Sequence, residues 1–433
     1  MIPQGHFMVV AEVRPGHEQP LRDALERMNS GPGQADPDNR LLPFGRFDTL
    51  HFARFAILVD TTHGDLAAHG VAPESLPTYL AFLGDCDGPG ARQVDEFVRV
   101  AASGLMEVFG HCVGCPTDGR SLAAWLHGHD RPVAAAYVNW IGRSVRQARE
   151  ERAIAEALAA RLRRFQSAAP GQLQSVRQQL VDYVAGERQQ GRLRMTPEPA
   201  TPIGWWWRNL AHAIAIPVLG LLALPLLLLY SPVFIWQLRT RERSDPEIVP
   251  APDPAHVAEL ATFEDRCITT AFTAMGSVKP GTFRGVLVVV LVALLDYAAR
   301  HVYGRGHLTR VQTIHFARWV FLDDKKRLLF ASNYDGILES YMDDFINKVA
   351  WGLNLVFSNG VGYPRTNWLV QGGARSSQAF KNYLRRHQLA NAVWYKADAG
   401  LSAMDLARHT RIREGLDRAS MSDREIEDWL RLM

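Results

Sequence analysis

The tetrapeptide His-Phe-Ala-Arg occurs twice in this chain, at residues 51–54 and 315–318, each time within an apolar segment. Upstream of each copy, "VRPG" at 13–16 corresponds to "VKPG" at 278–281. The two tetrapeptides are 264 residues apart, and "VRPG" and "VKPG" are 265 residues apart. The two offsets therefore differ by a single residue. Matches at a steady offset indicate an internal repeat. A repeat constrains the fold strongly, because both copies are expected to form the same structural unit.

A longer block of matches keeps an offset of 248 residues without a gap. It contains Phe82/Phe330, Asp87/Asp335, Gly88/Gly336, Asp95/Asp343, Phe97/Phe345, Gly104/Gly352, Leu105/Leu353, Val108/Val356, Phe109/Phe357, Gly114/Gly362 and Pro116/Pro364. A weaker block, for which coincidence is the alternative, has an offset of 258: His129/His387, Tyr137/Tyr395 and Ser144/Ser402. The predicted units cover about 8–150 and 270–415, and the length of 433 residues suits two or more domains.

Both units are expected to follow one order of elements. The predicted strands are short and apolar or alternating: 6–13, 49–60, 78–85 and 133–140, then the segment before Val278, 313–324, 327–333 and 367–373, with 391–398 as an extra strand. The predicted helices are 18–28, 92–109, 283–300 and 338–357. The order β-α-β-β-α-β is that of a ferredoxin-like unit. The expected fold class is α+β: two tandem ferredoxin-like (βαββαβ) repeats with antiparallel sheets, packed face to face or closed into a barrel.

An insertion separates the two units and includes a long hydrophobic segment. The expected parts are a charged helical connector at 151–204, the hydrophobic segment at 205–243, a linker at 244–269 and, after the second unit, a C-terminal helix at 416–433. From Ala211 to Trp236 there are 26 residues without a formal charge, and about 20 suffice to span hydrocarbon. Tryptophan and arginine flank this run, as at membrane interfaces. We therefore expect a helical membrane anchor, with a buried core helix as the alternative.

Two topologies are open to this hydrophobic segment. A single crossing would place the two units on opposite sides of the membrane, where their sheets could not pair. Pro217, Pro225 and Pro232 favour kinks, and basic residues on both flanks favour cytoplasmic ends. We therefore expect a re-entrant or in-plane helical hairpin, with both units on the cytoplasmic side of the inner membrane. The shorter apolar run at 286–295 is expected to be a buried helix, with membrane contact as the alternative.

Charge and cysteine content narrow the class of protein. The 48 Lys and Arg residues nearly balance the 45 Asp and Glu residues, which argues against a nucleic-acid partner. The first residues do not follow the pattern of a secretory signal, and four unevenly spaced cysteines do not suggest a disulfide framework. Cys112 and Cys115 form a C-x-x-C motif. Such a motif can be a redox pair or half of a zinc site, and the alternative is two ordinary buried cysteines.

In an ideal strand, His315 and Ala317 point to one face and Phe316 and Arg318 to the other. A buried arginine needs a carboxylate or an anionic ligand. One interpretation is a structural ion pair of Arg318 with Asp335 or Asp343, repeated by Arg54 with Asp87 or Asp95. The other is that Arg318 and His315 face a ligand cavity between the sheets.

The duplicated architecture resembles the dimeric α+β barrel superfamily, whose tandem members include the dye-decolourising haem peroxidases. The resemblance covers about two thirds of the chain. The segment "GDCDG" at 84–88 fits their G-x-x-D-G pattern, while the second copy, "SNYDG", keeps only Asp335 and Gly336. The resemblance implies that Asp87 acts on the distal side of haem together with an arginine. The alternative is a turn in which Asp caps the next helix and Gly supplies backbone freedom.

The resulting functional hypothesis is a membrane-anchored, peroxidase-like oxidoreductase that acts on a hydrophobic small molecule between the two units. His315, Arg318, Asp335 and Asp87 are the catalytic candidates. Haem is the cofactor implied by the resemblance; His387, Arg54 and Asn333 are the candidate contacts, while His315, His387 and His409 could serve as its axial ligand. The alternative is a non-enzymatic, membrane-associated lipid-binding or scaffold protein. Membrane lipid is the expected partner in both cases.

Overall fold

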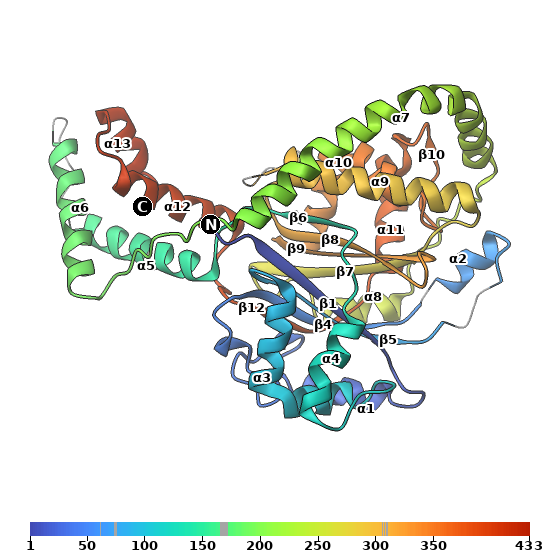
Figure 1. Cartoon of the computed structure of the whole chain (residues 1–433), viewed down its shortest axis with the longest axis horizontal. Coiled ribbons are helices and arrows are strands. Elements are labelled where there is room, and N and C mark those ends of the chain that lie inside the picture. Colours follow the sequence, from blue (N-terminus) through green and yellow to red (C-terminus); the bar gives the residue numbers. More distant parts are fainter. Residues whose placement is uncertain (61, 73–75, 165–171, 305, 307, 309–310) are drawn as a thin grey trace.

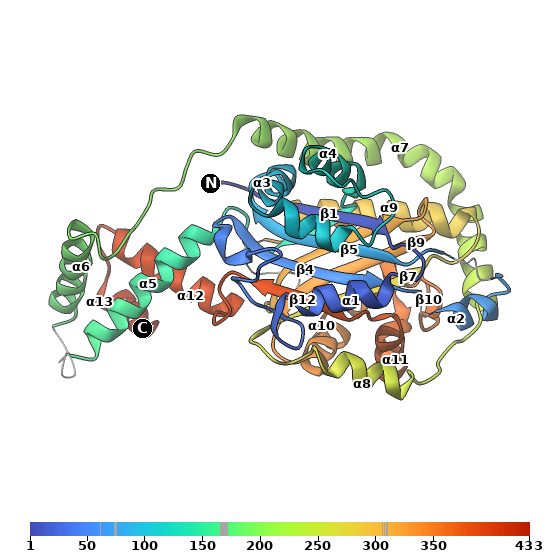
Figure 2. The ribbon, with the colours of Figure 1, turned by 90° about the horizontal axis from the view of Figure 1, so that it is seen from below.

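The computed structural model describes residues 1–60, 62–72, 76–164, 172–304, 306, 308 and 311–433. Two sheets pack against each other, helices cover their outer faces, and a small helical bundle extends from one end (Figure 1, Figure 2). Nearly all strand pairs are antiparallel. The expected α+β class with antiparallel sheets and a long apolar helix is therefore confirmed.

The first sheet has six strands. Their order is β1 (Gln4–Glu12), β5 (Tyr79–Asp87), β4 (Leu50–Leu58), β12 (Asn391–Lys396), β3 (Gln34–Ala35) and β2 (Asn29–Gly31). β12 comes from the second half of the chain and pairs antiparallel with β4.

The second sheet has four strands. Their order is β6 (Ala135–Val138), β8 (Ile314–Leu322), β9 (Arg327–Asp335) and β7 (Thr269–Ser277). Here β6 comes from the first half of the chain and pairs with β8. Each sheet thus contains one strand from the other half of the chain.

The segments that lead into these exchanged strands link the sheets at both edges. Before β6, Arg131 donates its backbone N–H to the carbonyl oxygen of Met8 on β1, at 2.8 Å. Before β12, Leu389 donates its backbone N–H to the carbonyl oxygen of Thr273 on β7, also at 2.8 Å. One continuous segment therefore contacts β1 and then β8, and the other contacts β7 and then β4.

The expected strand at 367–373 is wrong. That segment contains the short hairpin of β10 (Thr366–Asn367) and β11 (Gln371–Gly372), which lies outside both sheets. Trp368 and Leu369 turn the chain there with φ of 55° and 60°, values that a regular strand does not adopt. The extra strand expected at 391–398 is β12, which belongs to the first sheet.

Helices cover the outer face of each sheet. The first sheet is covered by α1 (Glu18–Glu26), α3 (Gly90–Phe109) and α4 (Gly119–His129), and the second by α9 (Thr282–His301), α10 (Leu338–Phe357) and α11 (Ser377–His387). Shorter elements connect them: η1 (Phe44–Arg46), α2 (His63–Ala68), α8 (Pro254–Ala261) and η2 (Gly373–Arg375). Between the sheets, aliphatic side chains such as Met8, Val320 and Leu329 fill one end, and Phe52, Phe316 and Trp394 pack at the other.

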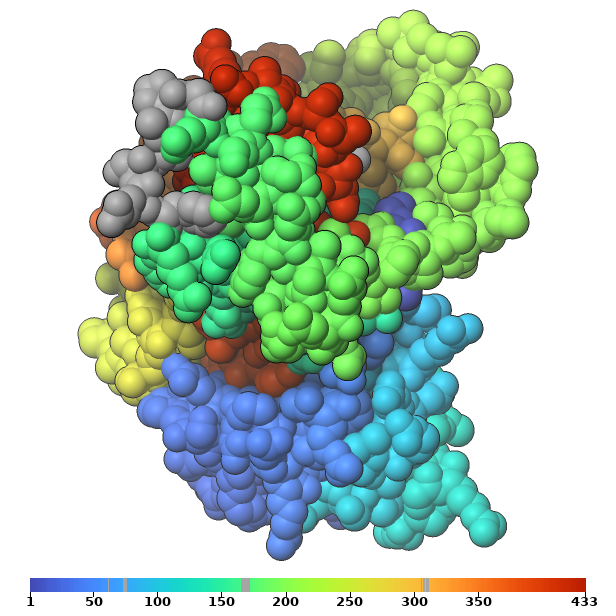
Figure 3. All heavy atoms as spheres, turned by 90° about the vertical axis from the view of Figure 1, so that its left-hand side faces the viewer, coloured from blue at the N-terminus to red at the C-terminus, as the bar shows by residue number. Residues whose placement is uncertain are grey.

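Four helices form the bundle at the end of the molecule. They are α5 (Val145–Leu162), α6 (Leu173–Gln189), α12 (Ala403–Asp417) and α13 (Asp423–Leu430). Leu158, Leu180, Ile412 and Trp429 pack together in its core. Figure 3 shows the connector helices beside the red C-terminal helices. The expected helices at 151–204 are present, and their partners are two C-terminal helices that the sequence did not assign to them.

The hydrophobic segment forms a single helix, α7 (Ile203–Ser244), and the expected hairpin is wrong. Pro217, Pro225 and Pro232 lie inside the helix, which follows an arc over one side of the molecule (Figure 1, Figure 2). A proline removes one helix hydrogen bond and bends the axis, and three spaced along 42 residues can bend a helix without ending it. None of the most apolar stretch of α7 is buried.

Candidate functional site

Arg318 on β8 reaches across to the first sheet. Its guanidinium donates to the carbonyl oxygens of Phe7 and Gly84, both at 2.9 Å, and to the carboxylate of Asp85. The side chains of Arg318 and Asp85 are 3% and 2% exposed. His6 Nδ1 also donates to Asp85, at 2.8 Å. The result is a buried ion pair that joins the two sheets.

Arg54 on β4 makes the corresponding contacts in the opposite direction. It donates to the carbonyl oxygens of Phe272 at 2.8 Å and Ser332 at 3.0 Å, and to Thr273 Oγ1 at 3.1 Å. It also donates to Asn333 Oδ1. Both copies of the tetrapeptide therefore use their arginine to bind the facing sheet.

The two arginines differ in the side chain that accepts their hydrogen bonds on the facing sheet. Asn333 occupies the position that corresponds to Asp85 at the offset of 248 residues. Asn333 Nδ2 donates to Asp85 Oδ2 at 3.3 Å, so the network combines two guanidinium groups with one carboxylate. Burial and the neighbouring Arg318 lower the pKa of Arg54 to about 9. The centre of the molecule is a packed polar network with an excess of positive charge.

The ion pairs that the sequence suggested within each half are wrong. Four carboxylates were expected to receive the arginines: Asp335, Asp343, Asp87 and Asp95. They instead pair with His315, Lys381, His51 and His127, respectively. The order of residues along one strand does not reveal the residues of a facing sheet, and Asp85 lies more than 230 positions from Arg318.

His315 lies at a β-bulge, where the pairing with β9 skips one residue between Ile314 and Phe316. His51 lies at a corresponding bulge on β4. Strict alternation would place His315 and Phe316 on opposite faces, but the bulge breaks it. The rings of His315 and Phe316 both pack against Phe52, with centroid distances of 5.4 and 5.5 Å.

Each of these histidines binds an aspartate that also caps a bundle helix. His315 Nε2 donates to Asp335 Oδ1 at 2.7 Å, and Asp335 Oδ2 accepts the first backbone N–H of α12 at 2.6 Å. His51 Nε2 donates to Asp87 Oδ1 at 2.9 Å, and Asp87 Oδ2 accepts the first backbone N–H of α5 at 3.0 Å. Asp87 was expected to cap the helix that follows its own strand, and it caps α5 instead.

A small pocket of about 50 Å³, with both polar and apolar walls, lies beside these two histidines. Its lining includes three kinds of side chain: the imidazoles of His51 and His315, the cations of Arg143 and Lys396, and the carboxylate of Asp398. Lys396 Nζ donates to Thr269 Oγ1 and to the carbonyl oxygen of Leu401. Burial lowers the pKa of Lys396 to about 8. His315, Asp335 and Asp87 are thus brought together with groups that the sequence did not single out.

His387 lies apart from this pocket, at the end of α11. Its Nδ1 donates to the carbonyl oxygen of Tyr383 at 2.8 Å, and its buried Nε2 has no hydrogen-bond partner among the described residues. Burial lowers its pKa to about 4. His129 makes the matching contact with Trp125, also at 2.8 Å. The contact recurs at the offset of 258 residues, where coincidence was the alternative.

The space around the candidate haem ligands is small. His387 lines a cavity of about 30 Å³, and a Cβ on Gly276 would lie 2.7 Å from its ring. His315 lines the 50 Å³ pocket, whereas pockets for cofactors are on the order of 300–1,000 Å³. His409, buried on α12, lines neither cavity. The residues present therefore do not fit haem at His315 or at His387.

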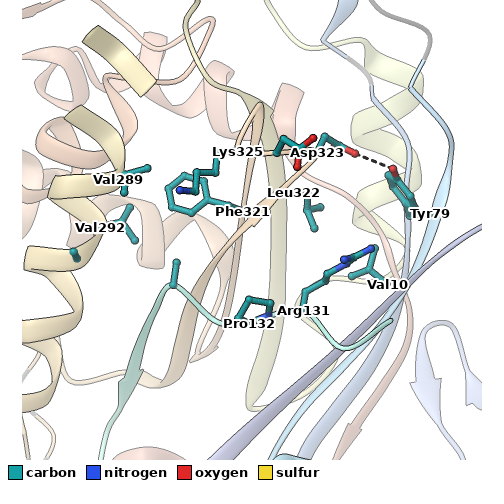
Figure 4. A pocket seen from close by; sticks show the side chains of 13 residues that line it. Val10, Tyr79, Arg131, Pro132, Val289, Val292, Phe321, Leu322, Asp323 and Lys325 are labelled. Carbon is teal, nitrogen blue, oxygen red and sulfur yellow. Dashed lines mark hydrogen bonds between the residues drawn. The ribbon is translucent and has the colours of Figure 1, made fainter. Parts of the chain in front are cut away.

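Larger pockets lie beside α9. One of about 560 Å³ lies between α9 and the C-terminal ends of β1 and β8. Val289, Val292 and Phe321 face it (Figure 4). Arg131 and Lys325 lie at its sides (Figure 4).

A second pocket, of about 620 Å³, continues along the same helix. It shares Val289, Asp324 and Lys325 with the first. We refer to the two together as the α9 groove. Sequence reasoning missed it, because its walls come from segments far apart in the chain; the apolar run at 286–295 was the available signal.

Comparisons with protein-family profiles, curated proteins and solved structures found no match. Within the described ranges, no group of three or more His, Cys, Asp and Glu side chains is placed to hold a metal ion. All four cysteines have free thiols. Burial raises the pKa of Cys112 to about 12 and also raises that of Cys115, which disfavours the reactive thiolate.

Proposed function

We propose that this chain is a monotopic membrane protein that binds the acyl chain of a lipid in the α9 groove. The observation that carries the proposal is the position of α7, an exposed apolar helix held at both ends against α9. Lipid binding is favoured over a peroxidase-like activity because the two sheets enclose a packed arginine network where a substrate cleft was expected.

The N-terminal part of α7 is fixed to the C-terminal end of α9. His212 Nδ1 and His301 Nε2 lie 2.9 Å apart, and Tyr297 Oη donates to the carbonyl oxygen of Ala213 at 3.3 Å. Both contacts are polar and involve only the first third of α7.

The C-terminal part of α7 is fixed to the other end of α9. Phe234 packs against Phe283 with a centroid distance of 5.5 Å, and Leu238 packs against Leu287. Glu242 on α7 accepts the backbone N–H groups of Trp368 and Leu369 at 3.0 and 2.8 Å. The two helices are therefore antiparallel and in contact at both ends.

The helix lengths explain the arc. At 1.5 Å per residue, α7 extends about 32 Å between Ala213 and Phe234, whereas α9 extends about 21 Å between Tyr297 and Phe283. The extra length bends the middle of α7 away from α9. Leu226, Leu228 and Leu229 in this middle part are 70%, 64% and 79% exposed.

An arc with both ends on one body suits insertion into one leaflet. A perpendicular crossing would carry α9 and its sheet into the hydrocarbon, together with the buried charges of Arg284 and Asp296 on α9. Trp206, Trp207 and Trp236 are exposed at the two ends of the apolar run, where interfacial aromatic residues are favourable.

The α9 groove is the site proposed for the acyl chain. Its apolar wall includes Val286 and Val290, which are 64% and 49% exposed on the same helix that holds α7. Both pockets fall within the volume range of small-molecule sites. Arg131 and Lys325 supply cations beside it for a lipid head group. Two carboxylates also line the pocket of Figure 4: Asp323, which is bound by Tyr79 and Arg327, and Asp324.

Membrane binding is tested by flotation of the detergent-purified full chain with vesicles of phosphatidylcholine and phosphatidylglycerol. The triple variant Leu226→Gln, Leu228→Gln, Leu229→Gln should reduce the vesicle-bound fraction at least about tenfold, since each buried leucine contributes about 1.5–3 kcal/mol. A matched control changes Val113, Ile268 and Met404 to Gln, since these are also exposed but lie outside α7. Equal binding by the two triple variants would contradict the proposal.

Lipid binding is tested separately by displacement of a fluorescent fatty acid from the protein in detergent. Val289→Trp should fill the groove and weaken binding at least about tenfold. Val302→Trp is the control, because Val302 is exposed at the end of α9 and lines neither pocket. If Val289→Trp binds the probe as the unmodified chain does, the groove is not the lipid site.

A further inference from the structure

A second site lies at the opposite end of the sheets from the pocket of Figure 4. The 50 Å³ pocket is lined by residues near the start of β1, β4 and β8 and by the last residue of β12. The pocket of Figure 4 is lined by later residues of β1 and β8. One water needs about 10–15 Å³ of such volume, so the pocket has room for roughly three to five water-sized atoms. That is the size of formate, acetate or phosphate.

Arg143 is the most deeply buried cation of this pocket. It is 5% exposed, and its guanidinium stacks over Trp140 with Cζ 4.1 Å from the ring centroid. One terminal nitrogen donates to Thr410 Oγ1 at 2.9 Å, while the buried Nε has no hydrogen-bond partner among the described residues. A buried guanidinium donor without an acceptor costs free energy unless a ligand or water satisfies it.

The loop that carries Arg143 is fixed in place. Gln4 at the start of β1 donates from Nε2 to the carbonyl oxygen of Arg143 at 2.6 Å and accepts the backbone N–H of Gly142 at 2.8 Å. Gln4 also lines the pocket. The cation is therefore held at the pocket wall before any ligand arrives.

Lys396 supplies a second cation from β12. Its ammonium group donates to Thr269 Oγ1 and Leu401 O, and no carboxylate of the described residues forms an ion pair with it within 4.0 Å. The carboxylates nearby are Asp335 on β9, Asp398 after β12 and Asp405 on α12. Asp335 is already bound by His315 and the start of α12.

We propose that Arg143 and Lys396 bind a small oxyanion, a carboxylate or phosphate of three to five heavy atoms, in this pocket. No carboxylate of the described residues forms an ion pair within 4.0 Å of either cation. Glu151 and Glu414 act on Arg143 from farther away, and Asp398, near Lys396, is also near Arg149 and Arg152. A bound anion would supply both cations with a direct counter-charge. Oxyanions accept charge-assisted hydrogen bonds from guanidinium and ammonium groups. His51 and His315 also line the pocket, and each directs Nε2 to its aspartate.

Binding is expected to depend on pH because Lys396 must be protonated. Burial lowers its pKa to about 8, against the influence of Asp335, Asp398 and other acidic groups, and Cys267 is also near it. The ammonium form is populated below this value and is lost as the pH rises above it. His315 is not expected to add a positive charge near neutral pH, because burial lowers its pKa and favours its neutral form.

The test is isothermal titration calorimetry of the detergent-purified full chain with sodium acetate and, separately, with inorganic phosphate, at constant ionic strength set with sodium chloride. Saturable binding of either anion is expected at pH 7, weakened at least tenfold at pH 9. A response to acetate alone assigns a carboxylate ligand, and a response to phosphate alone assigns a phosphate. Absence of saturable binding for both anions would overturn the proposal.

Two variants connect the binding to the pocket. Lys396→Met should weaken anion binding at least tenfold and remove the loss between pH 7 and pH 9. Arg143→Lys keeps the charge and should also weaken binding at least tenfold, because it loses the planar donor group; it supplies the test if Lys396→Met does not fold. Arg99→Gln is the control, since Arg99 is exposed on α3, does not line the pocket and pairs with Glu96 at 3.1 Å. Unchanged affinity in a folded Lys396→Met or Arg143→Lys variant would refute the site.

Discussion

Arg318 on β8 and Asp85 on β5 form an ion pair across the two sheets, although they lie in different halves of the chain. Arg54 extends from the first sheet to the second and donates a hydrogen bond to Asn333, the residue that corresponds to Asp85 in the repeat. Each strand that carries the repeated tetrapeptide thus binds the other sheet, and the network couples the two halves.

Removal of Arg318 should destabilise the protein strongly. Arg318→Met leaves the buried carboxylate of Asp85 without its main counter-charge, which typically costs about 3–5 kcal/mol. Arg54→Met should cost less, because Arg54 has no carboxylate of its own. Denaturant unfolding followed by circular dichroism measures both; an equal loss would show that the two positions are energetically equivalent.

The Arg318→Met variant should also change the response to acid. Burial raises the pKa of Asp85, but Arg318, His6 and Arg54 together lower it to about 2. A carboxylate with a depressed pKa stabilises the fold above its unfolded pKa, and this contribution is lost as the pH falls through the folded value. Without Arg318 the carboxylate should protonate at higher pH. The stability deficit of the variant should therefore narrow between pH 7 and pH 4, and a constant deficit would contradict this account.

The matching glycines Gly104 and Gly352 should tolerate alanine differently. A Cβ on Gly104 would lie 1.8 Å from the carbonyl oxygen of Leu41, which is backbone and cannot give way cheaply. A Cβ on Gly352 would meet only the side chain of Val349, at 3.2 Å. Gly104→Ala should lower the melting temperature by several degrees, as expected for overpacking of about 1–3 kcal/mol. Gly352→Ala should change it little, and the reverse order would refute the predicted contact.

Asp335 should stabilise α12 from outside the helix. Its Oδ2 accepts the first backbone N–H of α12, and loss of such a cap typically costs about 1 kcal/mol. Asp335→Ala, which removes the acceptor, should therefore increase hydrogen exchange in the first turn of α12. Asp405→Ala, which removes one side of the capping box within the same helix, is a useful comparison. Unchanged exchange in Asp335→Ala would show that the contact contributes nothing.

The two ends of α7 should lie on the same side of the membrane. Arg208 and Arg243 are exposed at opposite ends of the helix, and each can be replaced by cysteine in a chain that lacks the native cysteines. A membrane-impermeant maleimide should label both positions from the cytoplasmic side of inverted vesicles. Labelling of the two positions from opposite sides would establish a crossing and exclude the monotopic arrangement.

The sequence by itself determined most of the local elements. Short apolar or alternating segments predicted β1, β4, β5, β8 and β9, and three- and four-residue spacing predicted α3 and α10. The uncharged run predicted a helical membrane-associated segment, but as a hairpin and not as the single helix α7. Such patterns depend on neighbours along one strand or helix, so they can be read without the tertiary structure. The repeat offsets also paired positions that make matching contacts, such as His51 and His315.

Only the tertiary structure decided the partners. The exchange of β6 and β12 between the sheets, the pairing of Arg318 with Asp85 and the bulge at His315 depend on contacts between segments distant in sequence. The same holds for the arc of α7, which is fixed by its two attachments to α9 and not by its prolines alone. A buried charge takes the partner that faces it in space, and no spacing within a single strand specifies the opposite sheet.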